Sequence, residues 1–206
     1  MAARATQHQS KTRILDAALT AIRTKGYGAT TVDDICALAG VTKGSFFHHF
    51  DSKQDLAVAA AQHFAEMADS LFAAAPYRCL TDPLDRLLGY VDFRATILNG
   101  PLPDVTCLLG TMAQETYDTH PAIRQACDTH ISAHAGEVAK DIAEAKRRHA
   151  PDADWSPESL GLYTQAVLQG AFILAKAKNG PDVAVECVRH LRRYLELLFD
   201  RKESQP

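Results

Sequence analysis

A run of side chains that can donate hydrogen bonds lies between Gly40 and Phe50 in this sequence of 206 residues. Its members are Thr42, Lys43, Ser45, His48 and His49. The run contains no acidic residue, and Gly44 in its middle lets another molecule approach the backbone closely. Hydroxyl, ammonium and imidazole donors at this spacing can bind the acceptor edges of nucleic-acid bases and the phosphate oxygens beside them. Contact with a nucleic acid is therefore the first chemistry that the sequence suggests.

Two histidines four residues apart form a second candidate site. At helical spacing, His130 and His134 share one face with Ile123, Cys127 and Val138. Three interpretations remain open, namely a hydrogen-bonded pair in the core or at an interface, polar groups of a ligand pocket, and two ligands of a metal ion. No third metal ligand follows at a suitable spacing, so we expect neither a metal nor a cofactor.

Cys107 is a candidate for a reactive thiol. Asp104 can cap a helix over residues 104–117, and Cys107 would then lie in its first turn, where the helix dipole lowers the pKa of a thiol. The alternative is a small apolar residue without reactivity, as most free cysteines are. The five cysteines are scattered without a Cys-x-x-Cys pair, so neither a disulfide framework nor a structural zinc site is expected.

Motifs typical of enzymes are absent from the sequence. It has no phosphate-binding glycine loop, nucleophile elbow or His-Glu-x-x-His helix, and we expect Glu115 and Asp118 to be solvated. A hydrophobic content of 47% with 23% charged residues is typical of a globular protein. The missing motifs lead us to expect a protein that is not an enzyme. Because no run of about eighteen apolar residues occurs and the first residues are polar, we also expect a cytoplasmic protein without a membrane partner.

Charge is distributed unevenly along the chain. Residues 1–53 contain seven Lys and Arg against four Asp, a net charge of +3, whereas the whole chain carries −3. A basic N-terminal segment on an acidic remainder would orient that segment toward a polyanion, although three charges are a modest bias.

Helical spacing of apolar residues recurs throughout, and the alternation typical of strands does not. We therefore expect an all-α protein of about nine helices. The expected helices cover about 10–25, 31–40, 42–49, 52–75, 83–98, 104–117, 121–149, 157–178 and 181–200. The second and third are short and are joined by a turn at Gly40, as in a helix-turn-helix, in which the second helix projects its N-terminal side chains into the major groove. A helical adaptor that binds only protein can contain the same hairpin.

Three segments decide between these interpretations: GYGATTVDDI at 26–35, AGVTKGS at 39–45 and HFDSK at 49–53. They closely resemble the DNA-binding head of the tetracycline-repressor (TetR) family. The resemblance covers roughly residues 10–56, about a quarter of the chain. The remaining helices are similar to the body of that family in number and order rather than in motif.

The resemblance implies a role for each matching position of the head. Thr31 and Lys53 would contact phosphates. The residues at or near base edges would be Thr42, Lys43, Gly44 and Ser45, with His48 and His49 on the flanking backbone. Phe47 stands where the family usually has a tyrosine whose hydroxyl meets a phosphate, so a hydrogen bond worth about 1 kcal/mol per half-site is lost. We expect the two histidines to compensate in part, more strongly below neutral pH.

The last two helices carry wide apolar faces, which fit either an ordinary core or, as the resemblance implies, a four-helix interface between two copies of the chain. The expected interface residues are Leu160, Tyr163, Val167, Gly170, Ala171, Leu174, Val188, Leu191, Leu195 and Leu198. The candidate ligand-binding residues are Cys107, Met112, Cys127, His130, His134, Tyr163 and Val167.

The sequence thus predicts a ligand-responsive regulator of transcription, expected to be a repressor, that binds palindromic DNA as a homodimer and is released by a small molecule. The alternatives are a regulator that senses thiol-reactive compounds through Cys107 and, outside this class, a helical adaptor. The expected domains are a disordered arm at 1–9, a helix-turn-helix domain at 10–52, a ligand-binding and dimerisation domain at 53–201, and a disordered tail at 202–206.

Overall fold

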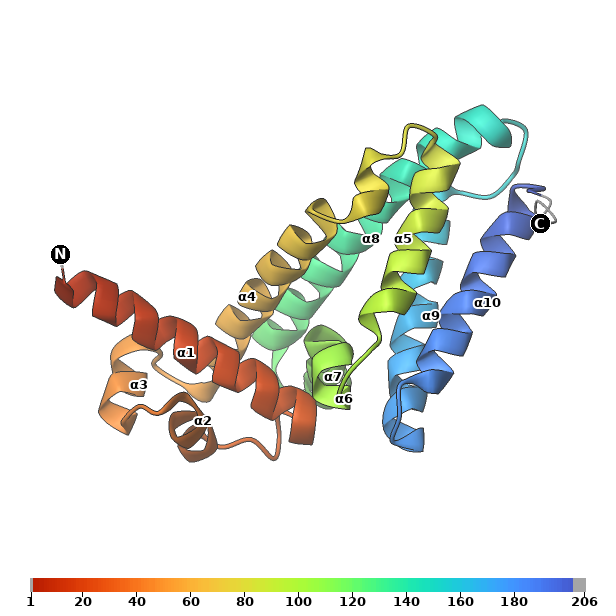
Figure 1. Ribbon diagram of the computed structural model, residues 1–206. Coiled ribbons are helices and arrows are strands. Elements are labelled where there is room, and N and C mark those ends of the chain that lie inside the picture. The colour runs from red at the N-terminus through yellow and green to blue at the C-terminus, as the bar shows by residue number, and fades with distance from the viewer. Residues whose placement is uncertain (1, 202–206) are drawn as a thin grey trace. The chain divides into compact units, whose positions relative to one another are not determined.

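A computed structural model describes residues 2–201 of the chain, with side chains from residue 9 onward. This part contains ten α-helices, one 3-10 helix (η1) and no strand (Figure 1). The elements are α1 (Ala2–Lys25), α2 (Val32–Ala39), α3 (Lys43–His49), α4 (Lys53–Ala73), η1 (Pro76–Cys79), α5 (Pro83–Ile97), α6 (Leu102–Val105), α7 (Leu108–Thr116), α8 (Pro121–His149), α9 (Pro157–Lys178) and α10 (Asp182–Leu198). The expected all-α fold is confirmed.

Two expectations about the helices were wrong. The helix expected over 104–117 is two helices, α6 and α7, because it breaks where the β-branched neighbours Val105 and Thr106 are both buried. The arm expected to be disordered at 1–9 is helical from Ala2, since it contains no Gly or Pro that would stop α1. The tail expected at 202–206 lies outside the described residues.

The chain forms two compact units, and α4 and α8 each contribute to both. Unit 1 comprises the residues up to Ala68 together with Thr106–His130, and unit 2 comprises Asp69–Val105 together with the residues from Ile131 onward. The boundary expected between residues 52 and 53 falls inside unit 1. The expected boundary describes which part of the chain binds DNA. The division into compact units does not test that function, so the boundary stays a prediction.

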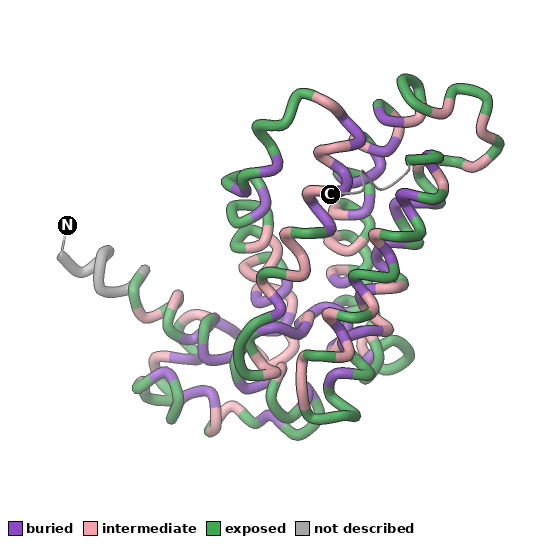
Figure 2. The backbone as a smooth tube through the Cα atoms, turned by 45° about the vertical axis from the view of Figure 1, so that its right-hand side comes forward, coloured by how far each residue is buried: buried purple, intermediate pink, exposed green. Residues whose placement is uncertain are grey.

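Unit 1 is built around a core shared by its first three helices. Ile14, Ile22, Ile35 and Phe46 are fully or almost fully buried there, and buried and exposed stretches alternate along the chain (Figure 2). The turn between α2 and α3 needs a residue that tolerates positive φ, and Gly40 supplies it with φ +63° as the C-cap of α2. Apolar spacing and caps thus fix both short helices.

In unit 2, α10 packs along both α5 and α9. Helices α8 and α9 approach very closely at Gly161, where an added Cβ would lie only 2.7 Å from the carbonyl oxygen of Ala135. Within the described residues, no helix is both long enough and apolar enough to span a membrane.

Candidate functional site

Helix α3 lies on unit 1 with one face buried and the other exposed. Phe46 is fully buried and Phe50 nearly so, and the two rings contact each other with centroids 5.8 Å apart. The exposed residues are Thr42, Lys43, Gly44, Phe47 and His48, while Ser45 and His49 are half-buried. The core therefore holds α3 so that the donor-rich N-terminus predicted from the sequence faces outward.

The N-termini of α2 and α3 are both capped by threonine. The Thr31 side chain accepts a hydrogen bond from the Asp34 backbone N–H at 3.1 Å, and Asp34 in turn accepts one from the Thr31 N–H at 2.8 Å, which completes a capping box. Hydrogen bonds from Lys25 and Thr31 hold the pKa of Asp34 well below its usual range. Thr42 caps α3 by accepting from the Ser45 N–H at 3.1 Å.

The two lysines of the predicted DNA surface differ in their surroundings. Lys43 forms an exposed ion pair with Asp33 at 2.8 Å, and this hydrogen bond and charge raise the pKa of Lys43. Lys53 is half-buried: its ammonium donates to the carbonyls of Tyr27 and Thr30, both at 3.0 Å, and lies 4.1 Å from the centre of the Tyr27 ring. Lys53 therefore fastens α4 to the turn after α1, and its contact with a phosphate stays a prediction.

The aromatic residues of α3 are placed differently from one another. Phe47 is 53% exposed, and its ring stands edge-on to Phe46 with centroids 5.2 Å apart. His49 is hydrogen-bonded to the Ser10 hydroxyl of α1 at 2.7 Å. Desolvation, followed by the neighbouring His48 and Lys11, lowers the pKa of His49. The fold thus makes protonation of His49 harder, and the expected compensation by the two histidines stays a prediction.

Glu115 is exposed, as expected, and its carboxylate also has a partner within unit 1. Its carboxylate on α7 accepts a hydrogen bond from the Gly28 N–H at 2.8 Å and fills the space beside Gly26, where any added Cβ would collide with it. Gly26 has φ +88°, a backbone conformation that disfavours any side chain even if the Glu115 carboxylate moved aside. In the same turn, the Tyr27 ring packs edge-on against His120, with centroids 5.2 Å apart. The turn that follows α1 is therefore held by α7 as well as by Lys53.

The candidate ligand-binding residues do not form one group. Met112 and Cys127 are buried in unit 1, where Cys107 is half-buried. Cys107 is the N-cap residue of α7 and not part of a first helical turn as expected, and its side chain makes no capping hydrogen bond. Burial, followed by the nearby Cys107, raises the pKa of Cys127 to about 12, so this thiol stays protonated.

The other ligand candidates lie on α8 and α9. His130 is half-buried at the end of the unit 1 part of α8, and His134 belongs to unit 2. His134 is hydrogen-bonded to Tyr90 and Arg94 of α5, two residues that the sequence interpretation missed. Across the residues whose side chains are described, no cluster of three or more His, Cys, Asp and Glu could hold a metal ion.

The expected interface residues divide into a buried set and a set that is at least partly accessible. Those buried inside the chain's own core are Leu160, Ala171, Val188, Leu191 and Leu195. Those half-buried or exposed are Tyr163, Val167, Gly170, Leu174 and Leu198. Tyr163 contacts Tyr194 of α10 on the exposed side, with ring centroids 5.2 Å apart, so it faces away from the core. The buried set lies on the inner side of the two helices, where α10 packs on α5 and α9, and its part in an interface with a second copy stays a prediction.

Comparison with known proteins assigns both halves of the chain. Residues 14–60 match the family model for bacterial regulatory proteins of the tetR family, and residues 83–191 match the tetracyclin repressor-like C-terminal domain. The chain belongs to the TetR family. It is 29% identical to the transcriptional regulator AcuR of Cereibacter sphaeroides, over 85% of this chain and 78% of that protein. It is 26% identical to the transcriptional repressor DhaR of a Mycobacterium species, over 77% and 78%.

The fold agrees with this assignment. The crystal structure of a TetR transcriptional regulator from Chloroflexus aurantiacus has a TM-score of 0.80 and 25% identity, covering 92% of this chain and 96% of that one. TetR-family membership makes the protein a regulator of transcription with an N-terminal helix-turn-helix. The roles of Glu115 and Lys53 in fastening the head could not be found from spacing, because their contacts join positions 87 and 26 residues away along the chain.

Proposed function

We propose that this TetR-family chain is a homodimeric repressor that binds a palindromic operator and is released by a small-molecule effector. The observation that carries the proposal is the outward face of α3. Lys43 and His48 are exposed on a short helix whose opposite face is anchored by Phe46, so both side chains lie on the surface of the head. A DNA-binding regulator works where the DNA is, so we propose a cytoplasmic location.

Gly44 supports close contact between α3 and a duplex. Glycine inside a helix costs about 1 kcal/mol relative to alanine. Packing within this chain does not require a glycine at position 44. A Cβ added there would meet only the Thr42 hydroxyl oxygen at 3.7 Å, which is an ordinary van der Waals distance. Gly44 is exposed next to the predicted reading residues, so we attribute it to close approach of a DNA backbone or base edge.

The second copy is proposed to pack on the exposed stripe of α9 and α10. Its large apolar members are Leu162, Tyr163, Ile173, Leu174, Tyr194 and Leu197. Leu197 is 80% exposed, and an added Cβ at Gly170 would meet no atom of the chain within 4 Å, which leaves room for a partner helix. An apolar surface of this kind, continuous over two packed helices, favours a four-helix interface. Two copies would present their heads about 34 Å apart, one turn of DNA.

A binding experiment tests the DNA contact. A duplex selected from a random library should bind wild type more tightly than unselected duplex, with strong salt dependence. Lys43→Ala should reduce that preference and lower the salt slope by about 1 per half-site. Lys140→Ala is the matched control, since Lys140 is also an exposed lysine in an ion pair, with Glu137 at 2.5 Å. No preference in wild type, or an equal effect of both variants, would contradict the proposal.

A second experiment tests the dimer. Leu197→Glu should shift the protein toward monomer in sedimentation and weaken operator binding, because it places a charge in the apolar stripe. Leu80→Glu is the control, since Leu80 is exposed on unit 2 outside the stripe. If Leu197→Glu remained fully dimeric, the interface would have to lie elsewhere.

A further inference from the structure

Five polar residues of unit 2 form a cluster that we name the Arg94 cluster. It consists of Tyr77 of η1, Tyr90 and Arg94 of α5, His134 of α8 and Gln165 of α9. Arg94 donates through Nη2 to His134 Nε2 at 2.8 Å and through Nε to the Tyr90 hydroxyl oxygen at 3.1 Å. That oxygen also accepts from Gln165 at 3.3 Å. Three helices thus bring polar groups to one place, and the Tyr77 ring of η1 packs against Tyr90 beside them.

Hydrogen-bond donors outnumber acceptors in the Arg94 cluster. Arginine can only donate, so His134 Nε2 must accept from Arg94. The Tyr90 hydroxyl lies 3.1 Å from the same nitrogen, which has a single lone pair for two donors. Desolvation, followed by the charges of Arg94 and Arg78, lowers the pKa of His134 to about 3, so this ring stays neutral at physiological pH. The cluster therefore keeps the full positive charge of Arg94 and lacks an acceptor.

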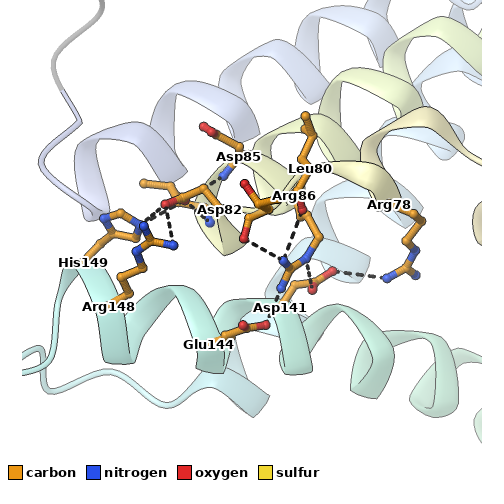
Figure 3. Close-up of polar contacts among 11 residues, drawn as sticks. Arg78, Leu80, Asp82, Asp85, Arg86, Asp141, Glu144, Arg148 and His149 are labelled. Atoms are coloured by element: carbon orange, nitrogen blue, oxygen red, sulfur yellow. Dashed lines mark hydrogen bonds and ion pairs between the residues drawn. The ribbon is translucent and has the colours of Figure 1, made fainter.

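Several other arginines of unit 2 have carboxylate partners. Arg78 and Arg86 both pair with Asp141, at 3.3 and 3.0 Å, and Arg86 also pairs with Glu144 (Figure 3). Arg94 has no carboxylate within ion-pair distance in the part of the chain whose side chains are described, and unlike the exposed Arg147 and Arg193 it is half-buried. Its guanidinium instead lies over the Phe72 ring, 4.3 Å from the ring centre.

The Tyr77 hydroxyl is a second unsatisfied donor. Tyr77 is only 5% exposed, and its hydroxyl has no hydrogen-bond partner among the described residues. Its ring lies 6.0 Å from that of Tyr90, and an added Cβ at Gly89 would be 2.6 Å from Tyr77 Cβ, so close packing of η1 on α5 fixes it. Burial is the main cause that raises the pKa of Tyr77. Among the nearby groups, Tyr90 and Asp141 also raise this pKa, whereas Arg78 and Arg94 lower it. A buried donor without an acceptor costs free energy that a bound acceptor would recover.

We propose that the Arg94 cluster binds the carboxylate of a small organic acid, with Arg94, Tyr77 and Tyr90 as donors. A monoanion balances the single charge, and a planar carboxylate fits the planar fork of guanidinium donors. Arg94, His134 and Phe93 are half-buried rather than fully enclosed, so solvent reaches the edge of the cluster. The rings of Phe72 and Phe93 pack edge-on, with centroids 5.7 Å apart, and flank the site where the organic part of the acid would lie.

Acid and amide pairs test the charge requirement directly. Benzoate and acetate are compared with benzamide and acetamide at constant ionic strength, by calorimetric titration and by thermal unfolding of the full-length protein. Benzoate, acetate or both should bind and raise the Tm, whereas the uncharged amides should not. If neither acid exceeds its amide or an equal concentration of sodium chloride, the proposal is overturned.

Variants assign the effect to the cluster. Arg94→Gln should abolish binding of the acid, and the matched control Arg147→Gln, an exposed arginine of α8, should retain it. Tyr77→Phe removes only the unpartnered hydroxyl, so it should fold at least as well as wild type yet bind the acid about tenfold more weakly. Undiminished binding by either Arg94→Gln or Tyr77→Phe would show that the acid binds elsewhere.

The step from binding to regulation rests on the proposed repressor function. An acid that is the effector should weaken operator binding by the same factor by which operator DNA weakens acid binding. Acid binding without any change in DNA affinity would leave the carboxylate site in place and contradict its effector role. Loss of operator binding by Lys43→Ala, with acid binding unchanged, would show that the two sites are separate.

Discussion

Replacing Phe47 by tyrosine should make this regulator bind DNA more tightly. Phe47 is 53% exposed on α3, and its edge-on contact with Phe46 fixes the ring before DNA arrives. The added hydroxyl would point to solvent in the free protein, so the substitution should leave the free energy of unfolding within about 0.5 kcal/mol of wild type. On DNA it would restore the phosphate contact that the family's usual tyrosine makes.

The size of the gain follows from one hydrogen bond per half-site. A neutral hydrogen bond contributes about 1 kcal/mol, so two half-sites give about 2 kcal/mol, or about 30-fold in Kd for the dimer. A hydroxyl carries no charge and releases no counterion, so the slope of log K against log salt should not change. Because phosphates carry no sequence information, binding to random duplex should tighten by a similar factor.

The assay is a titration of labelled operator and of random duplex at several salt concentrations, with wild type and Phe47→Tyr side by side. Three outcomes would refute the reasoning. A change in operator Kd below about twofold would mean that the ring does not reach a phosphate. A steeper salt slope would indicate a rearranged interface, and tightening on operator alone would indicate that the hydroxyl contacts a base.

Two further predictions concern unit 2. Gly161→Ala should destabilise the protein by about 1–3 kcal/mol in chemical denaturation, because the new Cβ would lie 2.7 Å from the Ala135 carbonyl oxygen and 3.1 Å from Ala139 Cβ. Gly136→Ala, where an added Cβ meets nothing within 4 Å, should instead stabilise by up to about 1 kcal/mol, and destabilisation of similar size in both would contradict the packing at Gly161. The pKa of His134 is lowered from 6.5 to about 3, so the unfolded chain binds its proton first, and stability should fall with pH below 6.5 by at most about 1.4 kcal/mol per unit. Denaturation curves at pH 7 and pH 5 should differ less in His134→Asn, and an unchanged difference would show that His134 is not the titrating group.

The sequence by itself determined the features that depend on neighbours a few residues away. The Thr31–Asp34 capping box and the Gly40 C-cap are read directly from residue types, because their hydrogen bonds span three or four positions. Helical periodicity likewise identified Phe46 as an anchor of α3. The family motif at 26–53 then supplied the predicted DNA surface, with Phe47 as a departure visible at once.

Features that join distant segments were decided only by the tertiary structure. The apolar stripe of α10 is wide because one side packs on α5 and α9, and only the fold separates buried Leu191 and Leu195 from exposed Tyr194 and Leu197. The hydrogen bond that Glu115 accepts from the Gly28 N–H could not be found from the sequence, since the two residues lie 87 positions apart.

The Arg94 cluster shows the same limit most clearly. Nothing in the spacing of Tyr77, Arg94 and His134 connects them, and His134 could be interpreted from sequence as a core residue, a pocket residue or a metal ligand. Packing of η1, α5 and α8 places these polar residues together and leaves Arg94 without a carboxylate among the described side chains. Local hydrogen bonds fix where helices begin and end, whereas long-range packing decides which polar groups meet and which of them stay unsatisfied.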